Sequence, residues 1–258
     1  FARMIELPDL VARNSDDLII ALMVFEANYG NDDIVPLLRP EVLIKITKLD
    51  DAAVRLEEII KENPENYYAW EKLLLVLNQK KDYKALEIRG EECASHFNRS
   101  FLAKILYANG ALENKNFNVA LEELKKAEIL AGDNKEFLSQ VLTMRADVYY
   151  RMKDYNKAFE TFDIAVRENG DDLTVINNYA YYLAEQDKNL KEAERKVKKV
   201  IEIEKNNTTY LDTYAWVLYK RGKLKDAARI MEQIVNSGET PDAEWYEHYG
   251  FILSKQNN

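Results

Sequence analysis

The chain has 258 residues, of which 47% are hydrophobic and 31% charged, and its formal net charge is −9. With only eight glycines and five prolines it lacks the turn residues that an all-β protein of this length needs, so helices are expected. So acidic a chain, taken as a whole, is not built to bind the phosphate backbone of a nucleic acid.

The N-terminal residues carry weak signals. Residue 1 is Phe rather than Met, which indicates a processed or excised piece. A helix is predicted from Asp16 to Asn28 with Ser15 as its N-cap, and a loop from Asn31 to Pro40, which contains two prolines. The longest apolar run, Leu18 to Phe25, is too short to span a bilayer, so no transmembrane segment is expected in this piece.

A second helix is predicted from Lys48 to Asn63, followed by Pro64, which cannot continue it. Its apolar residues recur at helical spacing, at Ala52, Leu56, Ile59 and Ile60. We expect residues 1–66 to form degenerate or partial N-terminal helical repeats.

A motif of two helices is clearest in the segment Ala146–Ala165. Small residues lie where the two helices would cross, aromatic residues would fill the gaps between repeats, and Lys153-Asp154 would make the turn. The small residues are Ala146, Ala158 and Ala165, and the aromatic residues are Tyr149, Tyr155 and Phe162. This segment resembles the second two-thirds of a tetratricopeptide repeat (TPR).

The same frame recurs along the chain in two columns of small residues. The first-helix column is Leu74, Ala108, Ala146, Ala180, Ala215 and Gly250, with spacings of 34, 38, 34, 35 and 35 residues. The second-helix column is Leu86, Ala120, Ala158, Ala193 and Ala227, with spacings of 34, 38, 35 and 34. Since one repeat cannot bury its apolar face alone, the predicted fold is all-α, a right-handed superhelical array of antiparallel helix pairs.

We expect the regular array to occupy residues 67–258. Its units are 67–100, 101–138, 139–172, 173–207 and 208–242, with an incomplete last repeat at 243–258 whose first helix runs over 243–256. Extra residues at Lys135–Leu138 predict a longer helix in the next unit, and one extra residue lies near Lys188–Leu190.

The last third of the chain has a narrower resemblance. It is carried by Asn178–Ala184, by Tyr210–Gly222 and by His248-Tyr249-Gly250. This run is similar to Bacteroidetes-type bacterial TPR proteins, many of them envelope lipoproteins. The resemblance implies a bacterial origin and a periplasmic or cell-envelope location, with the cytoplasm as the alternative.

Groups that could perform chemistry are scarce. The only histidines, His96 and His248, fall in different repeats, so neither a catalytic triad nor a helical zinc site is predicted. The single cysteine, Cys93, excludes an internal disulfide and a cysteine-based zinc cluster, and we expect a buried, inert thiol. No glycine-rich phosphate loop is present. We therefore expect no enzyme activity, no cofactor, no metal and no small-molecule substrate.

The remaining candidate site is the concave groove, which the first helices of TPR arrays line. An aromatic ladder edged by polar groups would suit a peptide; the alternative for each aromatic residue is packing between repeats. The predicted groove residues are Asp147, Tyr150, Asn177, Tyr181, Asp212, Trp216, Tyr219 and Phe251. The Lys, Asn and Arg pattern by which chaperone-type TPR domains clamp a carboxylate tail is absent.

Two further expectations concern partners. Residues 188–229 hold 12 Lys and Arg against 6 Asp and Glu, so they could meet an acidic partner, a nucleic acid or an anionic lipid, although a solvated helix face is favoured. The leading hypothesis is a protein-interaction scaffold that binds a peptide or protein segment and no nucleic acid. The alternatives are a self-assembly module and a non-catalytic appendage of a larger envelope complex.

Overall fold

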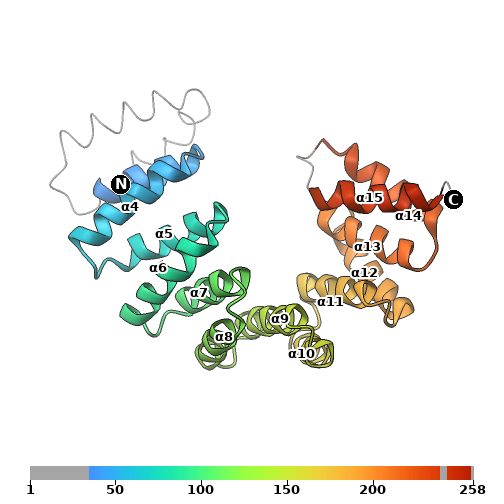
Figure 1. The fold of residues 1–258 in the computed structure, drawn as a ribbon, viewed down its shortest axis with the longest axis horizontal. Coiled ribbons are helices and arrows are strands. Elements are labelled where there is room, and N and C mark those ends of the chain that lie inside the picture. The colour runs from blue at the N-terminus through green and yellow to red at the C-terminus, as the bar shows by residue number, and fades with distance from the viewer. Residues whose placement is uncertain (1–34, 239–242, 257–258) are drawn as a thin grey trace. The chain divides into compact units, whose positions relative to one another are not determined.

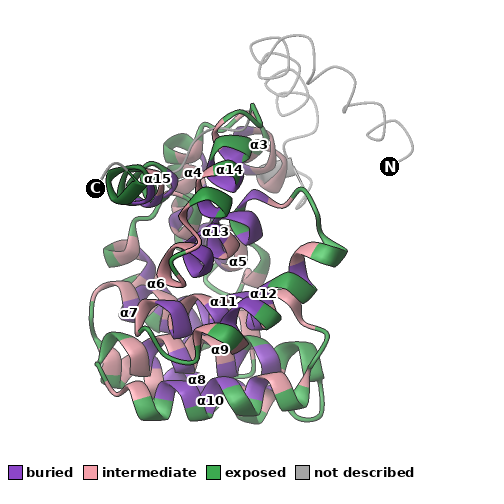
Figure 2. Ribbon diagram, turned by 90° about the vertical axis from the view of Figure 1, so that its right-hand side faces the viewer, coloured by how far each residue is buried: buried purple, intermediate pink, exposed green. Residues whose placement is uncertain are grey.

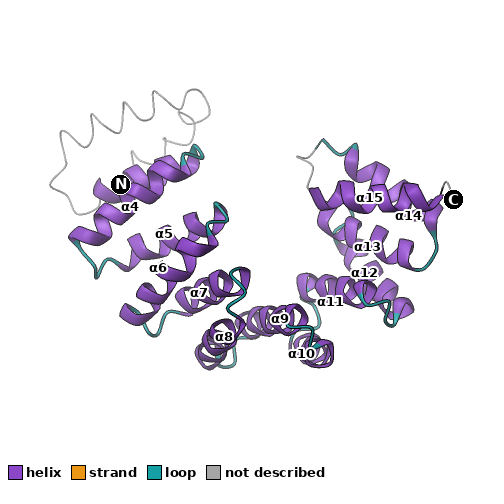
Figure 3. Cartoon of the chain, viewed as in Figure 1, coloured by secondary structure: helices purple, strands orange, loops and turns teal. Residues whose placement is uncertain are grey.

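The computed structural model describes residues 35–238 and 243–256. Within these ranges the regular elements are all α-helices, thirteen in number, joined by short turns (Figure 3). The predicted helix at 16–28 and its cap lie outside the described residues. The chain divides into two compact units, one ending at Ala131 and the other beginning at Gly132. The expected division at 66/67 rests on repeat regularity rather than on contacts, and it stays a prediction.

In its described part the first unit holds six helices, each packed against the next in the chain (Figure 1). They are α3 (Val35–Lys45), α4 (Leu49–Glu62), α5 (Tyr67–Gln79), α6 (Tyr83–His96), α7 (Phe101–Glu113) and α8 (Phe117–Ala131). The aliphatic residues predicted for the helix before Pro64 are all buried on α4. Cys93 on α6 is fully buried, as expected, and burial raises the pKa of its thiol to about 12.

The predicted loop at 31–40 is wrong for its described part, because α3 begins at Val35. Pro36 lies in the first turn, where a backbone N–H has no helical partner in any case. Pro40 lies inside the helix and removes one backbone hydrogen bond. The helix forms nonetheless because Leu43 is buried against the core of this unit, where Ile44 also packs.

The described residues of the second unit form seven helices. They are α9 (Lys135–Arg151), α10 (Tyr155–Glu168), α11 (Leu173–Glu185), α12 (Leu190–Ile203), α13 (Thr208–Lys220), α14 (Leu224–Val235) and α15 (Ala243–Gln256). The longer helix expected from the extra residues at 135–138 is confirmed, since α9 has 17 residues. We call α9, α11, α13 and α15 the first helices of this unit, and α10, α12 and α14 its second helices. Each first helix contacts the next first helix as well as its own partner.

Buried residues in this unit lie where its helices face one another, while the outer sides of second helices such as α10 are exposed (Figure 2). The small residues Ala146, Ala180 and Ala215 have no exposed surface, and the same is true of Ala158 and Ala193. Their burial is what close crossing of two helices requires.

Side-chain caps form a third column that repeats along the chain. The helices α5, α7, α9, α11 and α13 each follow a residue whose side-chain oxygen accepts a backbone N–H from the first turn. These residues are Asn66, Ser100, Asn134, Asp172 and Asn207. Such a cap satisfies a donor that the helix itself leaves unpaired. The entry into each of these first helices is therefore fixed by its own sequence.

Two glycines of the first unit lie where helices cross closely. A Cβ atom on Gly110 of α7 would come 2.6 Å from the backbone nitrogen of Glu87 on α6. A Cβ atom on Gly90 of α6 would come 2.8 Å from the Cα atom of Tyr107. By contrast, Gly250 on α15 has nothing within 4 Å of that position.

Alanine at these positions should act in opposite directions. We expect Gly110→Ala to destabilise the first unit, because an overpacking cost of about 1–3 kcal/mol exceeds the gain of about 1 kcal/mol in helix propensity. Gly250→Ala should instead stabilise the second unit by about 1 kcal/mol, since only the propensity changes. Urea unfolding followed by circular dichroism measures both, and equal effects would contradict the close crossing at Gly110.

Candidate functional site

All eight predicted groove residues lie in the second unit, on its first helices. Asp147 and Tyr150 come from α9, and the rest from α11, α13 and α15. We call the surface formed by these residues together with Tyr182, Glu185, Glu244 and His248 the first-helix face. Side-chain contacts join seven of the eight residues into one chain, with Phe251 attached through the Trp216 ring at a centroid distance of 6.1 Å, and Asn177 is the exception.

Trp216 is the most enclosed aromatic residue of the first-helix face, with 7% of its surface exposed. Its ring stacks on Tyr219 at a centroid distance of 4.9 Å and on His248 at 4.2 Å. Its Nε1 donates a hydrogen bond of 2.7 Å to Glu185 of the preceding first helix. Packing between repeats, the alternative considered for each aromatic residue, therefore accounts for much of the Trp216 ring.

A similar bond joins α11 to α9. The hydroxyl of Tyr182 donates to a carboxylate oxygen of Asp147, and its ring lies 4.2 Å from that of Tyr150. The amide of Gln186 donates a hydrogen bond of 2.7 Å to the Tyr150 hydroxyl. Burial, followed by the negative charge of Asp147, raises the pKa of Tyr182 well above its ordinary value, so its hydroxyl is a permanent donor.

A buried acid–imidazole pair joins α15 to α13. Nδ1 of His248 lies 2.9 and 3.0 Å from the two carboxylate oxygens of Asp212, and both side chains are buried. Burial opposes a charge on the imidazole, but the hydrogen bond and negative charge of Asp212 outweigh it, with further help from Glu244 and Glu185. The pKa of His248 is raised as a result.

One contact bridges α11 and α15 on the first-helix face. The hydroxyl of Tyr181 on α11 donates a hydrogen bond of 2.9 Å to Glu244 on α15, although α13 lies between these helices in the array. Neighbouring helix axes lie about 8–10 Å apart, so only long side chains that extend toward each other over α13 can meet in this way. The bond therefore ties α15 directly to α11.

Asn177 on α11 differs from the others because it has an unsatisfied atom. Its side chain is 3% exposed, and its Oδ1 has no hydrogen-bond partner. An unpaired buried acceptor costs about 1–3 kcal/mol, so buried polar groups are normally satisfied.

Sequence reasoning missed the residues that link this chain of contacts. Tyr182 joins Tyr150 to Tyr181, whose ring lies 5.5 Å away, and His248 joins Asp212 to Trp216. The available signal in the sequence was spacing, because Asp212 and His248 are 36 residues apart, which is close to the length of one repeat. A donor and an acceptor one repeat apart on successive first helices are candidates for contact.

The basic segment 188–229 is largely paired within the unit. Glu194 on α12 is buried and holds Lys198 at 3.0 Å, Lys223 at 3.0 Å and Arg221. These pairs fasten the turn between α13 and α14 to α12, and they neutralise part of the local positive charge.

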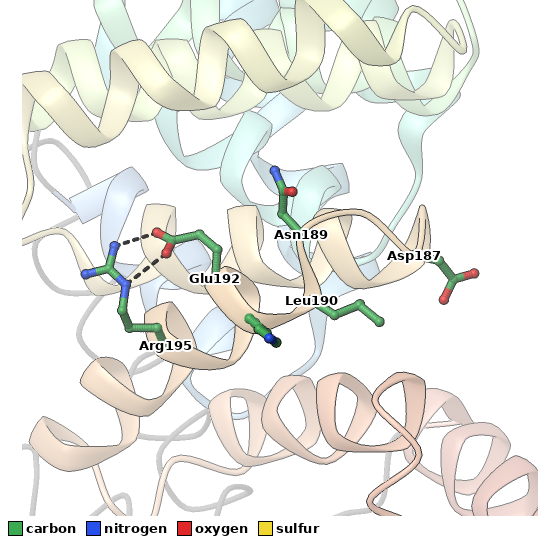
Figure 4. A pocket seen from close by; sticks show the side chains of 6 residues that line it. Asp187, Asn189, Leu190, Glu192 and Arg195 are labelled. Carbon is green, nitrogen blue, oxygen red and sulfur yellow. Dashed lines mark hydrogen bonds and ion pairs between the residues drawn. The ribbon is translucent and has the colours of Figure 1, made fainter.

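An open depression at the start of α12 is a weaker candidate site (Figure 4). Figure 4 shows Asp187 and Asn189 pointing in different directions, while both guanidinium bonds of Arg195 go to Glu192, at 2.7 and 2.8 Å. The side chains do not converge on a common point, so the depression offers no coordinated set of groups for a ligand.

The described residues offer neither a metal site nor a membrane-spanning helix. In the described ranges no group of three or more His, Cys, Asp or Glu side chains is placed to hold a metal ion. Among the thirteen described helices, none combines the length and hydropathy needed to cross a bilayer.

The hydrogen bond between Tyr182 and Asp147 can be tested by removing one atom. We expect Tyr182→Phe to lower the unfolding free energy of the second unit by about 1–3 kcal/mol, because a charged acceptor loses its donor. Tyr246→Phe on α15, where the ring is exposed, is the matched control and should change it by less than about 0.5 kcal/mol. Thermal and urea unfolding provide the measurement, and equal effects would show that the bond contributes nothing.

Comparison with known proteins supports the fold. The family model of the tetratricopeptide repeat matches residues 42–85, which span α4 and α5 and begin in the region expected to be degenerate. A TPR repeat-containing protein of Pseudomonas aeruginosa is 24% identical over 222 residues, covering 86% of this chain. The match takes in 31% of that relative, so this chain spans about a third of its length.

Solved structures share the architecture. A tetratricopeptide-repeat protein from Parabacteroides merdae superposes with a TM-score of 0.66 at 18% identity, covering 86% of each chain, and supports the resemblance to Bacteroidetes-type TPR proteins. The pilF protein of Pseudomonas aeruginosa gives 0.61 at 17% identity, covering 85% of this chain and 96% of its own. At these identities the likeness shows the fold alone. The repeated helix pairs, the match to the repeat's family model over residues 42–85 and the shared architecture together show that this chain has the tetratricopeptide-repeat fold.

Proposed function

We propose that this chain holds an extended peptide segment of a partner protein against the first-helix face of its second unit. Tetratricopeptide-repeat proteins are in general non-catalytic scaffolds for protein interactions, and this chain has their fold. A chain from the APC/C hetero-tetramer Cut9–Hcn1 also shares the fold, with a TM-score of 0.67 at 12% identity, covering 93% of this chain and 46% of its own. Residues of the face itself support the finer proposal.

The observation that carries the proposal is the unpaired oxygen of Asn177. A buried acceptor without a donor is rare in folded proteins, and a ligand that brings an N–H group removes its cost. An extended peptide presents backbone N–H groups that no helix or sheet of its own has used. Because this oxygen has almost no exposed surface, a peptide N–H reaches it only when the Asn177 side chain shifts toward the face.

Partly exposed aromatic rings also lie on the first-helix face. Tyr150, Tyr181 and Tyr219 are half-buried, and Phe251 is 46% exposed. Rigid aromatic side chains bind with little loss of side-chain entropy, which makes them effective anchors. Trp216, enclosed on both faces of its ring, supports its neighbours in this arrangement rather than offering a surface of its own.

Charge on the face favours a peptide that is neutral or basic. Glu185 and Glu244 accept hydrogen bonds from the uncharged groups of Trp216 and Tyr181, which do not neutralise the carboxylate charges. Asp147 accepts from Tyr182 and is in addition paired with Arg151 at 3.2 Å. An acidic peptide would meet these charges unfavourably. A carboxylate tail is accordingly a poor ligand, in agreement with the missing clamp pattern.

The test is selection from a phage-displayed library of random linear peptides on the full chain, followed by fluorescence anisotropy with the enriched peptides. We expect Asn177→Leu to weaken binding about three- to tenfold while leaving stability equal or higher, since an apolar residue of similar shape relieves the unpaired acceptor. Phe251→Ala should weaken binding as well, through lost contact area.

Ile203→Ala, at an exposed position of α12, is the matched control and should bind as the wild type does. Enriched peptides that bind all three variants equally would exclude this face as the site. If no peptide is enriched and light scattering shows mass that grows with concentration, self-assembly becomes the better account.

A further inference from the structure

Helix α15 is attached to the rest of the second unit by few buried side chains. Of its 14 residues only Trp245, His248 and Ile252 are buried (Figure 1 shows the helix beside α13 and α14). Trp245 and Ile252 belong to an apolar cluster that α14 completes with Ile230, Met231 and Ile234. The same cluster includes Leu211, Ala215 and Leu218 of α13, while the polar contact between α15 and α13 is made by His248, which is a titratable group.

The imidazole of His248 is surrounded by groups from three helices. From α13, Asp212 binds Nδ1 and Trp216 stacks on the ring at 4.2 Å. From its own helix, Glu244 lies 3.9 Å from Nε2.

The third helix, α11, contributes the negative charge of Glu185 and the hydroxyl of Tyr181, which is bonded to Glu244. Lys220 of α13 lies over the Trp216 ring at 5.3 Å and is paired with Asp187 at 3.5 Å. Helix α14 contributes apolar residues to the cluster that holds Trp245 and Ile252. The surroundings are therefore dominated by carboxylates.

We propose that the Asp212–His248 pair makes the docking of α15 onto α13 dependent on pH, so that α15 covers the Trp216 ring while the imidazole is charged and loosens when it loses its proton. Helix α15 also carries Phe251 of the proposed peptide contact, but the pH dependence of its docking does not depend on which ligand the face binds.

The direction follows from linkage. Folding raises the pKa of His248 above its ordinary value of 6.5, since the carboxylates outweigh the effect of burial. The stabilisation is fully present below that ordinary value and is lost as the pH rises through the raised value. Above it a neutral imidazole faces three carboxylates, of which Asp212 is buried. Docking is therefore tighter in acid and weaker in mildly alkaline solution.

Release would change what the first-helix face presents. The covered side of the Trp216 ring and the carboxylate of Asp212 would both become accessible, and the bond from Tyr181 to Glu244 would open. Because α15 is held by three buried residues, this opening is local and leaves α9 to α13 in place.

The experiment is amide hydrogen exchange on the full chain between about pH 5.5 and pH 9, read by mass spectrometry and corrected for the intrinsic pH dependence of exchange. Protection of peptides from α15 should fall with rising pH, by up to tenfold for each unit by which folding raises the pKa of His248. Peptides from α10 in the same sample should show constant protection.

Three variants make the test specific. His248→Asn keeps an N–H donor for Asp212 but cannot titrate, so its α15 protection should be independent of pH. Asp212→Asn keeps the imidazole and removes its main charge, so the fall should move to lower pH. His96→Asn changes the other histidine, which is exposed on α6, and should behave as the wild type does.

If His248→Asn fails to fold, the titration of His248 in the wild-type chain by NMR supplies the second measurement. Its midpoint should coincide with the fall in α15 protection and lie above the ordinary histidine value of 6.5. Constant α15 protection in the wild type, or an equal fall in His248→Asn, would overturn the proposal.

Discussion

The second unit depends on one kind of interaction, in which an aromatic side chain donates an N–H or O–H to a carboxylate on another first helix. Trp216 bonds to Glu185, and Tyr182 bonds to Asp147. His248 bonds to Asp212 in the same way. Each of these bonds joins successive first helices. The ring buries apolar surface between two helices, and its polar hydrogen bonds to one particular carboxylate. A single side chain therefore supplies buried area and also fixes how the two helices are aligned.

The first unit achieves the same stacking by different means. There Gly90 and Gly110 let the backbones of α6 and α7 approach closely. Polar links between its repeats are amides and ion pairs, such as Asn109 donating to Asn78 at 2.7 Å and Arg89 paired with Glu57 at 2.8 Å. Small residues and short polar groups leave few rings for a ligand, which agrees with an aromatic ladder confined to the second unit.

Sequence periodicity predicted much of the fold because every repeat meets the same neighbours. The extra turn of α9 and the last helix at 243–256 follow from counting residues between small positions. The helix α3 could not be predicted in this way, since two prolines argue locally against it and only burial of Leu43 against the core favours it. Local signals were strong wherever the repeat was regular and misleading where tertiary packing overrode them.

The candidate site was predicted at the level of positions but not of pairings. Counting residues from repeat to repeat placed Asp212 and Trp216 on one face. Their shared partner His248 lies one residue away from the position that the same count assigns to this face on the last helix. The unpaired oxygen of Asn177 could not be read from the sequence either, because satisfaction of a hydrogen bond depends on the exact placement of neighbours.

The extra length of α9 has a consequence for how such an array can change during evolution. Four additional residues advance a helix by about 400°, so they turn its surface by only about 40° beyond a full revolution. Asp147 and Tyr150 therefore keep facing α11 despite the insertion. An insertion of two residues would turn them by about 200° and bury them in the wrong layer. Repeats of this kind should tolerate insertions of about one helical turn and reject shorter ones. The number of residues between successive N-caps therefore shows which insertions the fold has accepted.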